Sequence, residues 1–152
     1  MLEDLLQFLH VLLAAFLTGL IGWERENRDM PAGLRTHMIV GSAAALLVIL
    51  GHMMVNFYNQ NDSNASMQYD PLRVVEAIIV GISFIGAGTI LKVADSEKIR
   101  YLTSAATILI SAGIGIAVAL ERFVLAMLIT GMVLVINSVI RKWESKKGRQ
   151  EE

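Results

Sequence analysis

The residues most able to do chemistry form one charged cluster between two apolar stretches. Residues 22–37 read Gly-Trp-Glu-Arg-Glu-Asn-Arg-Asp-Met-Pro-Ala-Gly-Leu-Arg-Thr-His. The formal charges of this cluster sum to zero, because its acidic and basic residues are equal in number: Glu24, Glu26, Asp29, Arg25, Arg28 and Arg35. Apolar sequence on both sides makes an arbitrary loop an unsatisfactory explanation, so the cluster is the best lead to function.

Three interpretations of the cluster remain open. Glu24 can pair with Arg28 at i,i+4 while Arg35 meets a lipid phosphate, which makes an interfacial hairpin. The cluster can also be a docking surface for another membrane protein, with Glu24 pairing across the loop with Arg25 or Arg35. Thirdly, its carboxylates are hard oxygen ligands of the kind that Mg²⁺ prefers, although the neighbouring arginines oppose a bound dication. The candidate metal ligands are Glu24, Glu26, Asp29 and, further along, Glu76.

Other chemistries lack residues to carry them. The chain has no cysteine, which excludes disulfides and thiol catalysis. His10, His37 and His52 have no metal-ligand spacing, and no nucleophile elbow, P-loop or zinc-protease motif is present. The net charge of −1 argues against nucleic-acid binding. We therefore predict neither an enzyme nor a cofactor.

The elements that position the cluster are membrane helices. Of the 152 residues, 55% are hydrophobic and the mean hydropathy is +0.57. Both values are higher than those of a typical soluble domain. Five stretches approach the 20 or so apolar residues that a spanning helix needs, namely residues 5–22, 36–57, 74–91, 101–120 and 123–140. The predicted fold is all-α, a polytopic five-helix bundle over residues 1–142 with a short charged tail at 143–152. Glu121 and Arg122 leave almost no loop, so the last two spans should form a tight hairpin.

Lysine and arginine predict the orientation. Eleven of them fall on one side and two, Arg73 and Arg122, on the other. The amino terminus should lie outside, and the cluster and carboxyl terminus in the cytoplasm. The polar 56–70 loop should be external, the 93–100 segment a surface turn, and the basic tail a contact to anionic lipid. Thr36 is the predicted N-cap of the second span.

The third span is unusual in its small residues. Charge-free residues 77–91 cover only about 22 Å, short of a hydrocarbon core of about 30 Å, so Glu76 reaches the membrane edge or the bilayer adapts. Ala77, Gly81 and Gly88 share one face, which is either a packing groove or part of a broken, ion-facing helix. The fourth span has Ser111, Gly115 and Ala119 at fourth-residue spacing, either for packing within the bundle or for a contact between subunits.

Five motifs in register resemble the MgtC/SapB family of bacterial inner-membrane proteins, over about residues 5–140. They are Gly-x-Glu-Arg-Glu at 22–26, Ala-Gly-Leu-Arg-Thr-His at 32–37, Asp-Pro-x-Arg at 70–73, Gly-Ile-Ser-Phe-Ile-Gly-Ala-Gly-Thr-Ile at 81–90 and Leu-Thr-Ser-Ala-Ala-Thr at 102–107. Ser83, Tyr101 and Ala119 depart from the glycines common in the family, and Ala77 replaces a residue that is often polar. The resemblance marks the following residues as partner-binding or structural: Glu24, Arg25, Glu26, Arg28, Gly33, Arg35, Thr36, His37, Arg73, Gly81, Gly86, Gly88 and Thr103.

The resemblance implies a five-span, multi-pass protein of the bacterial inner membrane with its amino terminus outside. It also implies a link to growth in low Mg²⁺ and to virulence, through regulation by contact with membrane partners, among them the F-type ATP synthase. Family members of that kind carry a cytoplasmic domain after the fifth span, and the expectation here is a short form without it. A homo-oligomer, with a dimer as the first guess, is also expected. The rival hypothesis is an oligomeric channel or transporter for Mg²⁺ or another cation, with its path along the third span past Glu76.

Overall fold

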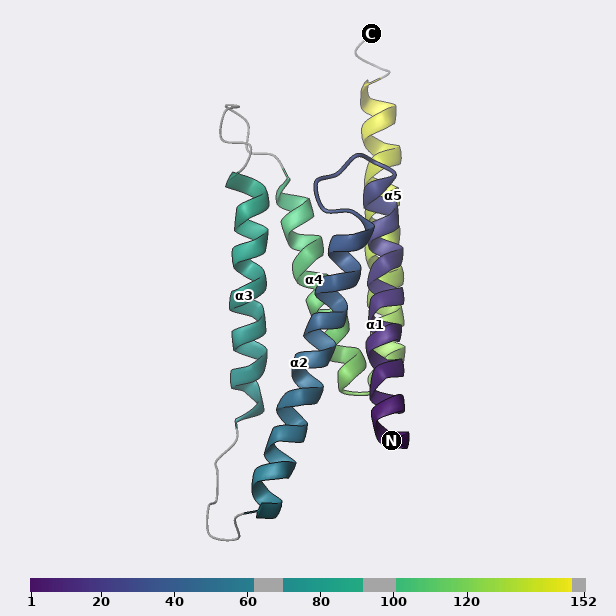
Figure 1. Ribbon diagram of the computed structural model, residues 1–152. Coiled ribbons are helices and arrows are strands. Elements are labelled where there is room, and N and C mark those ends of the chain that lie inside the picture. The colour runs from purple at the N-terminus through teal and green to yellow at the C-terminus, as the bar shows by residue number, and fades with distance from the viewer. Residues whose placement is uncertain (62–69, 92–100, 149–152) are drawn as a thin grey trace.

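The computed structural model describes residues 1–61, 70–91 and 101–148, with only the backbone at 59–61, 91 and 140–148. This part of the chain is all-α, as predicted, and forms five helices (Figure 1): α1 (Leu2–Glu26), α2 (Leu34–Asn61), α3 (Pro71–Leu91), α4 (Leu102–Ala119) and α5 (Phe123–Gly148). The predicted 93–100 turn and most of the predicted 56–70 loop lie outside the described residues.

Four helices, α1 to α4, are long and apolar enough to cross a membrane. In α5 the described apolar stretch is Phe123–Val139, and the helical backbone continues to Gly148. Large apolar side chains cover the outer surface of the bundle; Phe16 is 61% exposed, Phe84 76% and Leu128 66%. A soluble protein rarely exposes so much contiguous apolar surface, so this is a multi-pass membrane protein whose outer face meets lipid or another protein.

α1, α2 and α4 pack against one another in the centre of the bundle, and the outer two helices flank them (Figure 1). α3 packs on α2 and α4, whereas α5 packs on α1 and α4. One apolar core cluster joins α1, α2, α4 and α5 around Ile21, Ile114 and Val118, and a second joins α2, α3 and α4 around Val40, Ile78 and Ile108. α2 and α4 therefore contribute to both cores.

A close approach between α2 and α4 depends on glycine. A Cβ at Gly115 would lie 2.1 Å from the Gly41 carbonyl oxygen, and a Cβ at Gly41 would lie 2.5 Å from the side chain of Thr18 on α1. Both distances are too short for any side-chain atom, so only glycine fits at either position. The small-residue face of the fourth span thus packs inside the bundle, which settles for Gly115 the alternative that the sequence leaves open.

α3 is one continuous helix from Pro71 to Leu91, so the hypothesis of a broken third span is wrong. It begins with Pro71 at the first helical position, and the Asp70 carboxylate accepts a hydrogen bond from the Leu72 N–H at 3.0 Å. Gly86 faces Ala105 of α4, but a Cβ added at Gly81 or Gly88 would meet nothing within 4 Å. The small face of α3 therefore points away from its own bundle.

Two helices end through a left-handed residue that is not glycine. At Asp29, φ is 53°; the Asp29 N–H donates to the Glu26 carbonyl, and the Met30 N–H donates to the Arg25 carbonyl. At Glu121, φ is 59°, and the N–H groups of Glu121 and Arg122 likewise donate to Val118 and Ala117. These paired bonds are those of a Schellman motif, which stops a helix and reverses the chain within two residues. The predicted α4–α5 hairpin is confirmed and owes its sharpness to this motif.

Candidate functional site

Polar side chains from four helices converge at one end of the bundle. The carboxyl ends of α1 and α5 and the amino ends of α2 and α4 all lie there (Figure 1). Eight residues form hydrogen bonds between elements at this end, and we call them the polar cluster: Glu24, Arg25, Glu26, Arg28, His37, Ser104, Thr107 and Asn137.

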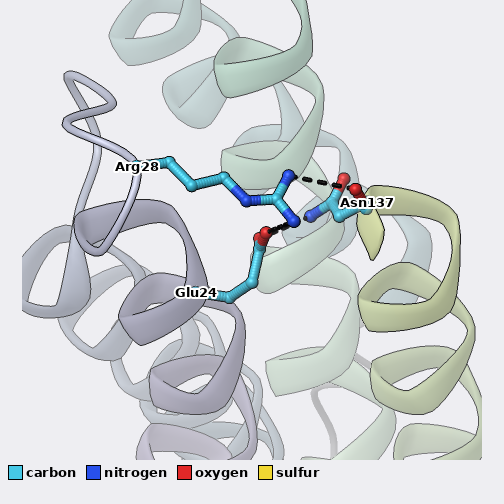
Figure 2. A network of polar contacts seen from close by, with 3 residues as sticks. All are labelled: Glu24, Arg28 and Asn137. Carbon is cyan, nitrogen blue, oxygen red and sulfur yellow. Dashed lines mark hydrogen bonds and ion pairs between the residues drawn. The ribbon is translucent and has the colours of Figure 1, made fainter. Parts of the chain in front are cut away.

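Glu24, Arg28 and Asn137 form a closed triangle between α1 and α5 (Figure 2). The side-chain amide nitrogen of Asn137, Nδ2, donates to Glu24 Oε2 at 2.9 Å. Arg28 Nη1 donates to the backbone carbonyl oxygen of Asn137 at 3.0 Å. The Arg28 guanidinium faces the other Glu24 oxygen, which is otherwise without a hydrogen bond among the described residues. The pairing of Glu24 with Arg28 at i,i+4 is confirmed, and the pairing of Glu24 with Arg25 or Arg35 is wrong.

Glu26 joins α1 to α2. Its Oε2 accepts a hydrogen bond of 2.7 Å from the Leu34 N–H, the first helical N–H of α2. The carboxylate therefore satisfies one of the N–H groups that a helix start leaves unpaired, and its charge suits the positive end of the helix dipole. The prediction that Thr36 caps this helix is wrong, because α2 begins two residues earlier and Thr36 lies within it. A residue from the preceding helix does the capping.

Gly22 and Gly33 make this junction close enough to form. A Cβ at Gly22 would lie 2.7 Å from the Leu34 Cα, and one at Gly33 would lie 2.9 Å from Glu26 Oε2. A larger residue at either position would push α2 and the Glu26 carboxylate apart. The glycines of the first two motifs thus let α2 start close enough to α1 for the Glu26 carboxylate to reach the Leu34 N–H.

Arg25 is the most deeply placed charge in the described chain. Its side chain is 3% exposed, and Nη2 donates to the Ser104 hydroxyl of α4 at 2.9 Å. Nε has no acceptor among the described residues. Removing a guanidinium from water is costly, and one neutral hydroxyl compensates little of that cost. Glu24, the preceding residue, is the acidic group that acts electrostatically on this guanidinium, although the two form no ion pair among the described contacts.

His37 is fully buried and ties α2 to α4. Its Nδ1 lies 2.8 Å from the Gly33 carbonyl oxygen, which can only accept, so Nδ1 carries the proton. Nε2 lies 3.3 Å from the Thr107 hydroxyl, whose single proton is directed at the Ser104 carbonyl oxygen 2.9 Å away. The contact of Nε2 with Thr107 makes His37 a structural link from α2 to the start of α4.

Several predicted site residues lie apart from the cluster. Asp29 and Arg35 are exposed at the same end, and Thr103 is exposed while its neighbour Ser104 makes the contact. Arg73 and Glu76 are exposed near the start of α3, at the other end of the bundle. The four carboxylates proposed as metal ligands do not converge, and no group of three acidic or histidine side chains suits a metal ion within residues 1–61, 70–91 and 101–148.

Four contributors were not among the residues singled out from the sequence. Ser104 and Thr107 stand in a recognised motif, but nothing in the order of residues separates them from Thr103. Gly41 gives no signal without its partner on α4. Asn137 does give one, because an amide in an otherwise apolar span is expensive and must find a partner.

Comparison with known proteins identifies the family of the chain. The sequence model of the MgtC family matches residues 11–146. The chain belongs to the MgtC family. That assignment confirms the resemblance drawn from the five motifs, and no solved structure matches the chain.

Curated relatives are identical to it at about a third of the aligned positions. The chain is 36% identical to "Protein MgtC" of Salmonella typhimurium strain LT2, over 92% of this chain and 56% of that protein. It is 35% identical to "Putative magnesium transporter YhiD" of Escherichia coli K12, over 88% and 60%. An uncharacterized protein of Haemophilus influenzae is 34% identical over 97% and 62%. The chain thus spans about six-tenths of the length of these relatives.

Proposed function

We propose that this protein serves magnesium homeostasis by contact with other membrane proteins and neither catalyses a reaction nor conducts ions by itself. Family membership and the printed names of relatives support the link to magnesium. The observation that carries the mechanism is the pairing of the polar cluster. Its charged and polar side chains form hydrogen bonds across α1, α2, α4 and α5, which brace this end of the bundle.

A braced end can present a surface of constant shape. Glu24, Arg25 and Arg28 are engaged inside the bundle, so they position the turn between α1 and α2. Asn27, Asp29 and Arg35 are exposed on that turn and the first turn of α2, and they are the residues that we assign to the contact. This divides the charged cluster into residues that brace and residues that bind.

The proposed topology has five spans, with the amino terminus outside and the polar cluster on the cytoplasmic side of the bacterial inner membrane. The excess of lysine and arginine supports it. The F-type ATP synthase is the candidate partner on the strength of the family resemblance. A role in growth at low Mg²⁺ and in virulence is proposed from the same family resemblance alone.

Site-directed photo-crosslinking in cells tests the contact. A photoreactive residue at position 27 or 35 should capture one specific membrane protein, and Arg35→Glu should reduce the capture from position 27. A photoreactive residue at position 122, exposed at the other end, is the matched control and should not capture it. Recovering only copies of this chain from positions 27 and 35 would replace partner contact with self-association.

Cation flux tests the rival function of transport. Glu76, Gly81 and Gly88 point away from the bundle, so a path along α3 needs a second copy to close it. Proteoliposomes that hold only this protein should pass no more Mg²⁺ or monovalent cation than protein-free vesicles do. Flux that disappears with Glu76→Ala would establish a channel between subunits and refute our proposal.

Labelling of single cysteines tests the topology, and the absence of native cysteine makes each site unambiguous. In intact spheroplasts a membrane-impermeant maleimide should label Arg122→Cys and spare Asn27→Cys until the cells are opened. The reverse pattern would invert the orientation.

A further inference from the structure

A cavity of about 870 Å³ lies at the end of the bundle opposite the polar cluster. All five helices contribute to it: the start of α1, the second half of α2, the start of α3, the end of α4 and the first residue of α5. Its size is that of a site for a small organic molecule. The proposed function makes no use of this cavity.

The carboxylates of Glu3 and Glu121 line the cavity, together with the imidazoles of His10 and His52. Among the described residues, neither lysine nor arginine lines it. The exposed Arg73 and Arg122 lie near but are not part of the lining. The amino terminus forms its ion pair with Asp4, at 2.7 Å. An occupant with a positive charge would complement these carboxylates.

The rest of the lining is apolar and aromatic. Leu6, Val75 and Ile116 form part of the walls, and the Phe123 ring lies 5.2 Å from the His10 ring. Aromatic faces attract organic cations, which lose little hydration on entering such a site. A bare metal dication needs several oxygen ligands around it, and the described residues offer no group of three acidic or histidine side chains that could hold one.

We propose that this cavity binds an organic cation with an apolar body, with Glu3 and Glu121 as its counter-charges. The apolar walls contact the apolar body, and the two carboxylates select the sign of the charge. The site is independent of the partner contact at the polar cluster.

Equilibrium binding of radiolabelled tetraphenylphosphonium to the purified full chain tests the proposal. Tetraphenylborate has the same shape and the opposite charge. We expect saturable binding of the phosphonium and weak competition by the borate. No saturable binding would overturn the proposal, and equal competition by the borate would leave an apolar groove without charge selection. Displacement by Mg²⁺ at equal concentration would assign the site to an inorganic dication instead.

Variants assign the binding to this cavity. Glu3→Gln and Glu121→Gln should each weaken phosphonium binding about fivefold, as for one partly exposed charge contact, and the double variant should weaken it further. Val75→Trp should abolish binding by filling the space. Glu76→Gln is the matched control, because this neighbouring carboxylate does not line the cavity, and its affinity should be unchanged. Unaltered binding in both glutamine variants would place the cation elsewhere.

Discussion

The two ends of the bundle solve the problem of polar groups in a membrane protein in opposite ways. At the polar cluster, glycines bring α1 and α2 together, and side chains of four helices are joined by hydrogen bonds. At the other end, α2 leans away from α1 (Figure 1), and Glu3, His10, His52 and Glu121 line a cavity without a hydrogen bond to one another among the described residues. The same helices run through both ends of the bundle. The two ends therefore differ in packing because the side chains there differ in size and in their hydrogen-bond partners.

This contrast suggests a division of labour. A close-packed end holds its exposed loop in one geometry, which suits recognition by a protein surface. A loosely packed end retains space for a small molecule. The same kind of substitution should therefore have different consequences at the two ends of the bundle.

Gly115→Ala should destabilise the bundle most, by about 3 kcal/mol, because the new Cβ meets the Gly41 carbonyl and must force α2 and α4 apart. Unfolding in a titration of sodium dodecyl sulfate, followed by circular dichroism, measures the change. Gly113→Ala on the same helix is the control. Its Cβ meets nothing within 4 Å, so the variant should be as stable as the parent or slightly more so. Equal losses in the two variants would show that the close α2–α4 approach is not needed.

Asn137→Leu should cost about 1 to 2 kcal/mol, because the Glu24 carboxylate loses its amide donor in a half-buried site. Ser138→Leu, at the neighbouring exposed position, should change stability little. A double-mutant cycle with Glu24→Gln isolates the coupling between α1 and α5. A coupling energy near zero would mean that the triangle of Glu24, Arg28 and Asn137 does not brace the polar end.

Glu26→Ala should cost about 1 kcal/mol, the usual value of a lost helix cap. Glu26→Gln keeps an oxygen that can accept from the Leu34 N–H and should recover most of the stability. Hydrogen exchange of the first turn of α2 is the local readout, and it should accelerate in the alanine variant alone. Equal exchange in both variants would remove Glu26 from the capping role.

Glu121→Gly should stabilise the bundle by about 0.5 to 1 kcal/mol, because glycine adopts the left-handed conformation that closes α4 without a steric cost. Asp29→Gly, the corresponding change at the polar end, should gain less, since aspartate tolerates this conformation better than glutamate. A thermal melt of each variant in the same detergent compares the two ends directly. A larger gain at Asp29 would mean that the polar end carries the greater backbone strain.

Much of this architecture could be predicted from the sequence because membrane helices are local. Each stretch of apolar residues forms its backbone hydrogen bonds within itself, so helix number and approximate position follow from hydropathy. The Glu24–Arg28 pair is local as well, one helical turn apart, and was predicted. The cap of α2 was not, because Glu26 acts from the previous helix across a turn whose closeness depends on Gly22 and Gly33.

What the sequence by itself determined is the all-helical membrane class, the sharp α4–α5 hairpin, the neutral charge balance of the cluster and, through five motifs in order, the family. What only the tertiary structure decided is which charges brace and which are exposed, that Gly115 packs against Gly41, that α3 turns its small face outward, and that a cavity lies at the far end. The physical reason is range. Hydropathy and helix stops act within a few residues, whereas Arg25 meets Ser104 across 79 positions and Glu24 meets Asn137 across 113, distances along the chain that only the packing of whole helices can close.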